Sequence, residues 1–312
     1  MKRFLQHTFR YLVRLLVFTF LILLGKLSYG QTNTWNGSAS NNWNTAANWS
    51  LNLVPTAAHD VVISINAAIL VDANSTINSL TISGNSTVSF TSSGGGRTIT
   101  IDNNGSTIAS GSSLTLQGST GNGTRSMSIN YSGTNRTMLI AGTLILTAVG
   151  EGTIYDASNS LTTVTGTIRN SGTGGGTVGV ITSAGANLSF SSGGTYDHAL
   201  NGGTIPTATW NAASNCNITG MTSNSPNGLA QTFGNFTWNC ASQTGIVATS
   251  GNIVVNGNFT LTSGRFTLSN SQTRTLTISG NYIQTGGTFD FNIGGSNYTT
   301  MYVAGNFLHT AG

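Results

Sequence analysis

A short motif recurs at a nearly constant interval in the last third of this chain, and it constrains the fold more than any other feature. Gly-Asn-Phe or Gly-Asn-Tyr begins at positions 234, 257, 280 and 305, so the successive intervals are 23, 23 and 25. The apolar positions keep the same register in four aligned sets: Ile253, Leu276 and Met301; Val255, Ile278 and Val303; Phe266 and Phe289; Leu268 and Phe291. A fixed interval of this length is typical of a solenoid, in which each repeat forms one coil.

Each repeat holds three short runs in which apolar and polar residues alternate, separated by Gly, Asn or Ser. This alternation predicts strands with one buried face, and three such strands with their turns account for one coil of about 23 residues. We therefore predict an all-β parallel β-helix. An antiparallel β-sandwich or barrel is the alternative, because many short strands would also serve those folds.

Upstream of residue 234 the pattern is weaker. Segments at Gly84-Asn85, Gly142-Thr143 and Gly166-Thr167 precede alternating runs, but their spacing is irregular. We predict one continuous solenoid over residues 61–312, with outward loops at the Gly- and Ser-rich stretches 92–96 and 171–176.

Charge is scarce and unevenly placed. Only 6% of the 312 residues are charged, and 41 are Gly, which excludes a helical bundle, a coiled coil and a typical cytosolic α/β enzyme. Five of the 11 basic residues lie before residue 27, and beyond them six Arg face seven acids. A nucleic-acid partner is not expected, because binding phosphates needs clustered cations.

The first thirty residues have the features of an export signal. Basic residues precede an apolar stretch from Leu15 to Leu24, and Ser28 and Gly30 place small residues before a cut at Gln31. We predict a cleaved signal peptide over 1–30, a secreted or outer-surface location, and no stable membrane span after cleavage. An uncleaved anchor is the alternative, although the apolar stretch is shorter than a spanning helix requires.

Export would allow the two cysteines to oxidise. The sequence separation of Cys216 and Cys240 is close to the length of one coil, so we predict a disulfide between neighbouring coils. The alternative is a buried pair of free cysteines. Two cysteines alone give no metal-site signature, and no metal or cofactor is expected.

Residues 31–60 differ from the repeats because three tryptophans crowd into fifteen residues. Trp35, Trp43 and Trp49 could stack on sugar rings as exposed aromatics do, or could cover the first coil as a cap. We favour an N-terminal cap over 31–60 and keep glycan stacking as the alternative role of these three residues.

Several phrases of the sequence resemble one protein family. They are Asn48-Trp49, Val54-Pro55 and Asp60-Val61-Val62-Ile63 near the start, GGTIPTATWN at 202–211, and QTFGNFTWNC at 231–240. These residues look like the large secreted surface repeat proteins of Bacteroidetes-type bacteria. The resemblance implies a right-handed parallel β-helix, adhesin-like surface display and often type IX secretion, although the family's carboxy-terminal sorting domain is missing here.

No catalytic constellation stands out. Polysaccharide-cleaving β-helices need paired carboxylates or acidic metal clusters, whereas seven acids are spread here over more than two hundred residues. Asp290 is expected to point outward alone. In Tyr196-Asp197-His198 adjacent strand residues would face opposite ways, and His198 beside Asp197 is expected to be a solvated loop pair. His309 shares the repeat position of Leu261 and Gln284, which favours a structural role. We expect no enzymatic activity.

Two functional hypotheses remain. The first is a secreted or cell-surface structural or adhesive protein acting as a stiff scaffold, with surface glycans or a neighbouring cell as partner. The second is a carbohydrate-binding module of a larger polysaccharide-processing protein. Ice binding is disfavoured, because the pairs Thr98/Thr100, Thr260/Thr262 and Thr275/Thr277 do not recur at one coil position.

The last residues stop in the middle of a repeat. Gly312 follows Gly305 at the same interval at which Gly264 follows Gly257 and Gly287 follows Gly280. We therefore expect the sequence to be a fragment whose last coil is uncapped and able to associate end to end.

Overall fold

The chain is described by a computed structural model that covers residues 30–312 except 120–124, 149–151, 173–178 and 296. The predicted signal peptide lies outside the described residues, apart from Gly30. Residues Thr32–Gly312 form one compact unit, and the architecture below is the architecture of this unit.

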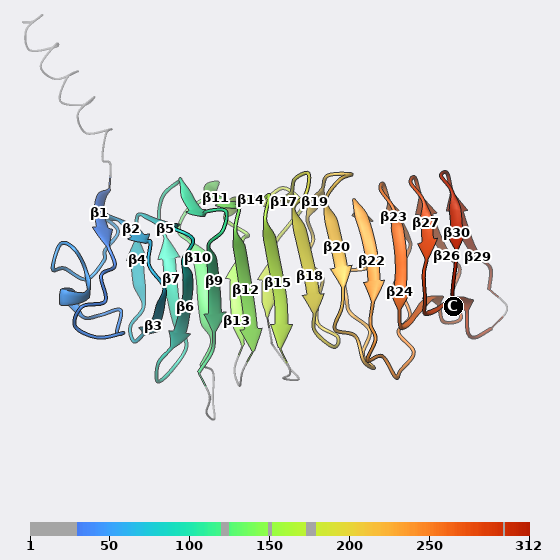
Figure 1. Ribbon diagram of the computed structural model, residues 1–312, viewed down its shortest axis with the longest axis horizontal. Coiled ribbons are helices and arrows are strands. Elements are labelled where there is room, and N and C mark those ends of the chain that lie inside the picture. The colour runs from blue at the N-terminus through green and yellow to red at the C-terminus, as the bar shows by residue number, and fades with distance from the viewer. Residues whose placement is uncertain (1–29, 120–124, 149–151, 173–178, 296) are drawn as a thin grey trace, which may run out of the picture. The chain divides into compact units, whose positions relative to one another are not determined.

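The unit is an all-β solenoid of stacked parallel strands (Figure 1). A single short 3₁₀ helix, η1 (Ala46–Asn48), is present among the described residues. Most coils contribute one strand to each of three sides, and the strands paired between successive coils run parallel. The antiparallel sandwich or barrel is therefore excluded, because those folds pair their strands antiparallel.

The first side begins at the N-terminal strand β1 (Gln31–Thr34) and continues through two sheets. Its further strands are β2 (His59–Ile63), β5 (Ser79–Ile82), β8 (Ser106–Ile108), β11 (Arg136–Ile140), β14 (Ser160–Val164), β17 (Leu188–Phe190) and β19 (Thr209–Trp210), then β21 (Thr232–Phe233), β23 (Ile253–Val255), β26 (Arg274–Ile278) and β29 (Thr299–Val303).

The second side is one continuous 11-stranded sheet and gives the count of coils. Its strands are β3 (Ala67–Val71), β6 (Thr87–Ser92), β9 (Ser113–Gln117), β12 (Thr143–Ala148), β15 (Thr167–Gly172), β18 (Thr195–Ala199), β20 (Asn215–Ile218), β22 (Asn235–Asn239), β24 (Phe259–Ser263), β27 (Tyr282–Gln284) and β30 (Phe307–His309).

The third side is interrupted. It holds β4 (Ser75–Ile77), β7 (Arg97–Ile101), β10 (Met127–Tyr131), β13 (Thr153–Asp156) and β16 (Val180–Thr182), and later β25 (Arg265–Ser269) and β28 (Thr288–Asn292). Between β16 and β25 the coils turn the third corner through loops. Three strands per coil, as expected from the repeats, thus hold at both ends of the solenoid but not in its middle.

The register of the second side measures the length of each coil. Counted in residue numbers, the ten steps from Ala67 to Phe307 range from 20, between Tyr196 and Cys216, to 30, between Leu114 and Leu144, with a mean of 24. The predicted alignments of Ile253 with Leu276 and of Phe266 with Phe289 are confirmed. One expected loop is short, because β6 ends at Ser92 and β7 begins at Arg97. The other falls largely on 173–178, outside the described residues.

The interior of the solenoid is a single apolar column. Alternate residues of each strand point inward, so that in β9 Leu114 and Leu116 are fully buried while Ser113, Thr115 and Gln117 are partly exposed. Toward the C-terminal end the inner row of the second side becomes aromatic. Its ring centroids are 5.5 Å apart from Phe236 to Phe259 and 5.6 Å apart from Phe259 to Tyr282, with nearly parallel planes. Equivalent residues therefore stack coil upon coil.

The glycines of the repeated motif are required by close approach rather than by a left-handed backbone. A Cβ on Gly257 would lie 2.3 Å from the Asn235 side-chain oxygen, and a Cβ on Gly280 would lie 2.4 Å from the Gly257 carbonyl oxygen. Neither residue has a positive φ, unlike Gly264 and Gly287 at the next corner. Adjacent coils thus touch backbone to backbone at this corner.

Candidate functional site

The three tryptophans of the N-terminal segment form a buried cluster. Trp35, Trp43 and Trp49 are at most 3% exposed. Trp49 packs edge-on against both others, with ring centroids 5.0 Å from Trp35 and 4.8 Å from Trp43, and Trp43 packs edge-on against Phe90 of β6. A sugar-stacking platform needs an exposed ring face, so the glycan-stacking role considered for these residues is not supported.

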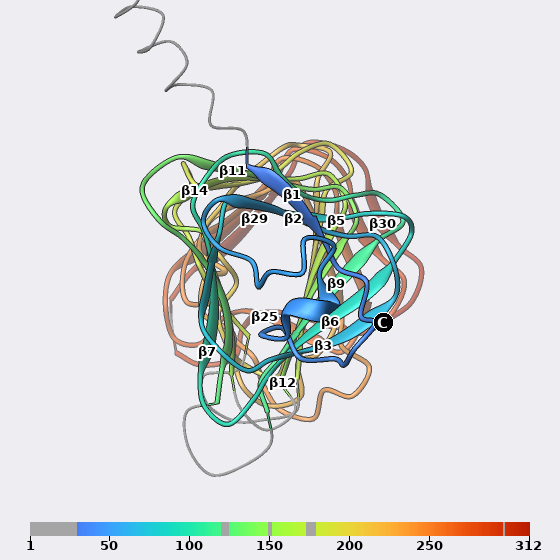
Figure 2. The same ribbon diagram turned by 90° about the vertical axis from the view of Figure 1, so that its left-hand side faces the viewer.

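The same segment covers the open edges of the first coil. β1 lies on the edge of β2, and residues 41–43 pair with β3, where Trp43 N donates to Leu70 O at 2.9 Å. The buried Asn48 amide orders this loop, accepting from the backbone of Ala39 and Ser40 and donating to Asn42 O. Figure 2 shows the segment around η1 lying across this end of the unit. These contacts are those of a cap, because they occupy strand edges that would otherwise be unpaired.

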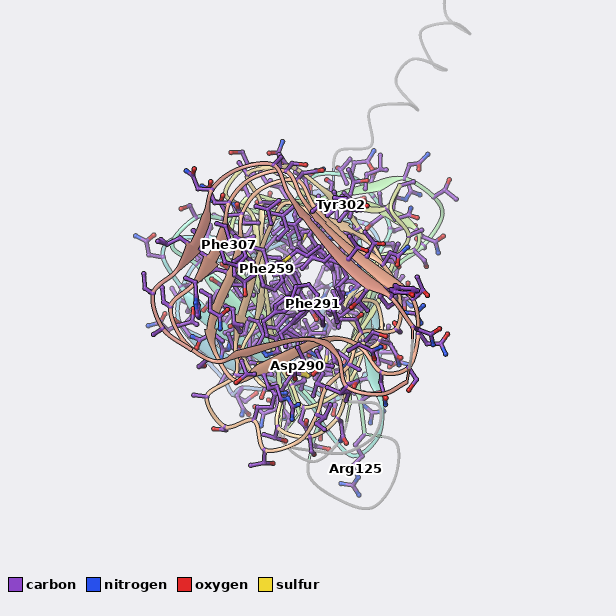
Figure 3. The ribbon with its side chains drawn as sticks, turned by 90° about the vertical axis from the view of Figure 1, so that its right-hand side faces the viewer. Arg125, Phe259, Asp290, Phe291, Tyr302 and Phe307 are labelled. Atoms are coloured by element: carbon purple, nitrogen blue, oxygen red, sulfur yellow. The ribbon has the colours of Figure 1, made fainter. Side chains whose placement is uncertain are left out.

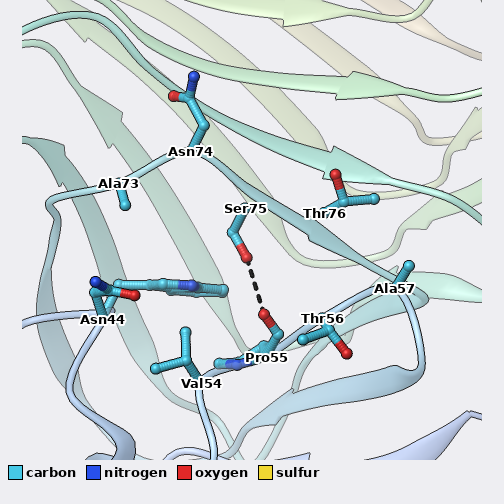
Figure 4. A pocket seen from close by; sticks show the side chains of 10 residues that line it. Asn44, Val54, Pro55, Thr56, Ala57, Ala73, Asn74, Ser75 and Thr76 are labelled. Atoms are coloured by element: carbon cyan, nitrogen blue, oxygen red, sulfur yellow. Dashed lines mark hydrogen bonds between the residues drawn. The ribbon is translucent and has the colours of Figure 1, made fainter.

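A crevice of about 260 Å³ opens where the cap meets β4 (Figure 4). Val54–Ala57 and Asn44 line one wall and Ala73–Thr76 line the other, and Ser75 Oγ donates across it to Pro55 O at 3.3 Å. The buried Trp43 ring also contributes to the lining. None of the residues that line the crevice is charged, and none offers an exposed aromatic ring. It is the seam between cap and coil rather than an organised ligand site.

The Tyr196-Asp197-His198 sequence is split between the two faces of β18. Tyr196 and His198 point inward and are fully buried, whereas Asp197 points outward to an ion pair with Arg169 on β15. Opposite faces were expected, but a solvated histidine was not found. His198 Nδ1 accepts from the Tyr196 hydroxyl at 2.9 Å and Nε2 donates to Gly202 O at 2.7 Å. Burial lowers the pKa of His198, so the imidazole is neutral and structural.

Both cysteines are free and buried, and the predicted disulfide is not formed. The coil that begins at Cys216 is shorter than the average coil, so Cys216 stands opposite Phe236, and Cys240 lies beyond the end of the paired strand. Cys240 Sγ donates to Ile218 O at 3.4 Å. Burial raises the pKa of Cys216 well above its usual value and that of Cys240 to about 11, so neither thiol is a ready nucleophile.

The described acidic side chains form ion pairs and hydrogen bonds on the outer surface of the coils. Asp197 pairs with Arg169, Asp102 with Arg136, and Asp290 with Arg265 on the preceding coil. Asp290 is therefore not alone, as the sequence had suggested, because Arg265 and Thr267 of β25 lie in the next rung beneath it. Asp60, Asp72 and Asp156 accept hydrogen bonds from neighbouring Ser, Asn or backbone groups. Among the described residues no set of three or more His, Cys, Asp and Glu side chains is grouped to hold a metal ion.

The outer face of the second side presents aligned, mostly small polar side chains, which we call the outer polar rows. One row is Thr87, Ser113, Thr143, Thr167, Thr195, Asn215 and Asn235, and the other is Ser89, Thr115, Ile145, Arg169, Asp197, Asn217, Thr237 and Thr260. The Thr pairs considered for ice binding lie on three different sides, in β7, β24 and β26. The sequence predicts strands with one buried face but does not show which outward residues share a row.

In the part of the chain that is described, no helix is long and apolar enough to cross a membrane. Fold and surface together define a parallel β-solenoid with an N-terminal cap. Residues 34–140 match the model of a family described as a domain of unknown function, DUF8693, so about a third of the chain, from the cap to the end of β11, is similar to that family. No curated protein and no solved structure matches the chain.

Proposed function

We propose that this chain is a structural scaffold of the cell exterior, an exported stiff β-solenoid that makes adhesive contacts and has no catalytic role. The observation that carries the proposal is the continuity of the coils. From β3 to β30 each second-side strand pairs in parallel with the next, over one apolar interior. Such a rod resists bending because each coil is fixed to its neighbours by backbone hydrogen bonds and buried side chains.

The outer polar rows support an adhesive role. Their hydroxyl and amide groups repeat at about the 4.8 Å spacing of neighbouring strands, so a hydrated surface or a glycan would meet many similar weak donors and acceptors. The described acids are already engaged by Arg, Ser, Thr or backbone groups, which favours a structural over a catalytic role.

Export and surface display, including delivery by type IX secretion, rest on the sequence features of residues 1–30 and on the family resemblance. Protease treatment of intact producing cells tests this part. We expect the chain to be degraded from outside, and retention of the intact chain inside the cells would contradict it.

Adhesion is tested by placing charge on the outer polar rows. We expect the double variant Thr115→Lys and Thr237→Lys to lower attachment of producing cells to glycan-coated and abiotic surfaces several-fold. The matched control, Thr107→Lys and Thr277→Lys, changes outward residues of β8 and β26 on the first side and should attach normally. Equal loss in both variants, or polysaccharide cleavage by the purified chain, would overturn the proposal.

A further inference from the structure

Asparagine followed by glycine is the pair of residues most prone to spontaneous deamidation, because glycine has no side chain to shield its N–H and leaves the backbone pliable. Six such pairs occur in the sequence. Five of them lie in the described residues: Asn36-Gly37, Asn104-Gly105, Asn201-Gly202, Asn227-Gly228 and Asn256-Gly257. The asparagine is exposed in all five, so exposure does not distinguish them. The hydrogen bonds of the two reacting groups do.

The reacting groups are the glycine backbone nitrogen and the asparagine side-chain carbonyl. A bond forms between that nitrogen and Cγ, the Cγ–Nδ2 bond breaks, and the NH₂ group leaves as ammonia with the proton of the glycine N–H. Water then opens the cyclic succinimide at either carbonyl and gives aspartate or isoaspartate. A glycine N–H that donates a hydrogen bond is withdrawn from this attack, and a side chain held by several hydrogen bonds does not turn freely toward it.

In three of the five pairs the glycine N–H is already engaged by another coil or by the cap. The donors and acceptors are Gly105 N and Thr137 Oγ1 at 2.7 Å, Gly257 N and Gly234 O at 2.9 Å, and Gly37 N and Asn48 O at 3.3 Å. The attacking nitrogen of these pairs becomes available only when the contact opens locally.

At Asn201 the side chain is engaged instead. Its Oδ1 accepts the N–H groups of Thr222, Ser223 and Asn224, with the longest of these bonds at 3.0 Å. The three bonds fix the side chain to the following coil. Although the Gly202 N–H has no acceptor among the described residues, its target is therefore held in place.

Asn227-Gly228 is the pair in which neither reacting group is engaged. Within the described residues, no hydrogen bond involves the Asn227 side chain or the Gly228 N–H. The backbone of Asn227 is bonded, since its N–H donates to Gly203 O at 2.8 Å and its carbonyl oxygen accepts from Ile205 N at 3.0 Å. The electrophile and the nucleophile can thus meet without breaking a hydrogen bond of the coil.

We propose that Asn227 is a self-modification site of the folded protein, at which attack by Gly228 N produces a mixture of aspartate and isoaspartate. Water is the co-reactant, and no enzyme takes part. The other four described pairs stay intact much longer. The proposal rests on the hydrogen bonds of these pairs and is independent of the adhesive role.

The modification acts on the third side of the solenoid, the side that carries Asp290 on β28 (Figure 3). Isoaspartate inserts an extra CH₂ group into the backbone before Gly228 and adds a negative charge. Space there is limited, because a Cβ on Gly228 would lie 2.3 Å from Ile205 O, and Gly228 O accepts from Gln231 Nε2 at 2.6 Å. We therefore expect isoaspartate to loosen this corner and to expose the Gln231 N–H, which donates to Leu229 O.

The test follows the reaction in the full folded chain at mildly alkaline pH over weeks, with digestion and mass spectrometry. Replacement of NH₂ by OH raises the peptide mass, and electron-transfer fragmentation separates aspartate from isoaspartate. We expect Asn227 to convert at least roughly tenfold faster than Asn256 or Asn201. Asn256 is the control for the nucleophile, because its side chain is also unbonded but Gly257 N is engaged. Asn201 is the control for the side chain, because Gly202 N is not engaged.

The denatured chain provides the second control, because there the pairs differ only in neighbouring sequence and should convert at similar rates. Conversion of Asn201 or Asn256 as fast as Asn227 in the folded chain would overturn the proposal. So would an unreactive Asn227 in the folded chain, or an equal preference for Asn227 in the denatured chain, because the fold would then not be its cause.

Two variants assign the signal and its structural effect. Asn227→Gln should abolish the mass gain of its own peptide, because the longer side chain cyclises slowly. Freshly prepared Asn227→Asp carries the charge without the extra CH₂ group. Hydrogen exchange of the Gln231 N–H should be faster in the aged parent protein that contains isoaspartate than in this variant. Equal exchange in the two would contradict the expected loosening by the longer backbone.

Discussion

At the scale of single residues, the motif glycines hold the coils at their observed separation. Gly280 has the Gly257 carbonyl oxygen 2.4 Å from where a Cβ would stand, so a methyl group there must push two backbones apart. We expect Gly280→Ala to lower the free energy of unfolding by about 1–3 kcal/mol, the usual range for overpacking. Chemical denaturation measures the change.

The matched control is Gly185→Ala. Gly185 has no positive φ, and the nearest atom to the place where its methyl group would stand is Thr209 Oγ1 at 3.8 Å, an ordinary contact. This variant should stay within about 0.5 kcal/mol of the parent protein. Equal stability of the two variants would mean that the coils can separate at this corner without cost.

We expect the buried His198 to make the free energy of unfolding depend on pH. Its folded-state pKa is lowered because the ring is buried, while in the unfolded chain it titrates near 6.5. Above that value both states are neutral. Below it only the unfolded state gains a proton, so stability falls as the pH falls, with a slope of at most about 1.4 kcal/mol per pH unit.

Comparison with His198→Gln isolates this contribution. Glutamine retains a donor and an acceptor for Gly202 and Tyr196 but does not titrate, and the outward Asp197 and the distant His59 are common to both proteins. The difference in unfolding free energy between the parent protein and the variant should shrink between pH 7 and pH 5. A difference that does not change with pH would show that His198 is protonated without cost in the folded state.

At the scale of the element, the cap joins sequence positions that local patterns could not connect. Trp43 fills the space above Phe90 and accepts the Trp49 Nε1–H on its carbonyl oxygen at 2.9 Å. We expect Trp43→Ala to cost about 3–5 kcal/mol, as large-to-small changes in a core do. In a solenoid the loss should be local, so hydrogen exchange should speed up in β2, β3 and β6 more than in β24 and β27.

Asn44→Ala is the control for this variant. Its side chain is exposed at the crevice, and its backbone N–H, which donates to Asp72, is unchanged by the substitution. Exchange in β2, β3 and β6 should remain as in the parent protein. If Trp43→Ala accelerated β24 and β27 equally, the unit would unfold as one block and the local account would be incorrect.

The sequence predicted the coils best where each repeated residue has its own backbone contact. From Gly234 onward the glycine meets the preceding coil and the asparagine bonds to the next, so spacing and structure agree. Upstream, coil lengths vary because corners accept extra residues without disturbing the strands. This variation explains why the disulfide prediction was wrong, since the separation of the two cysteines matched the average coil but not the shorter coil that holds Cys216.

The candidate site was predicted less well than the fold, for a physical reason. Because side chains alternate along β18, His198 lies on the same face of the strand as Tyr196. Its burial could therefore have been predicted from the aromatic residue two positions earlier. The ion pair between Asp290 and Arg265 could not have been predicted, because it depends on which residues of successive coils lie side by side. The tryptophans were ambiguous from composition alone, and only the strand edges beneath them distinguish a cap from a platform.

At the scale of the whole unit, we expect the interruption of the third side to divide the solenoid into regions of different local stability. Between β16 and β25 the corners are loops, which are joined by separate coil-to-coil bonds, such as Thr244 N to Thr222 O at 2.8 Å, rather than by a continuous strand ladder. Asn201 Oδ1 accepts three successive N–H groups, those of Thr222, Ser223 and Asn224. The second side of the same coils keeps a full ladder through β18, β20, β22 and β24.

These loops should therefore open before the strands that flank them. We expect amide hydrogens of residues 200–208, 220–231 and 241–252 to exchange at least roughly tenfold faster than those of β20 and β22, because local opening there breaks fewer bonds and exposes less apolar surface. Asn201→Ala should widen the difference by freeing three N–H groups, while Asn224→Ala, which keeps its backbone donor, should not. Hydrogen exchange with mass spectrometry on the same peptides measures both. Equal protection of loops and strands in the parent protein would mean that the buried side chains Ile205, Leu229 and Val247 hold the third corner as firmly as a sheet would.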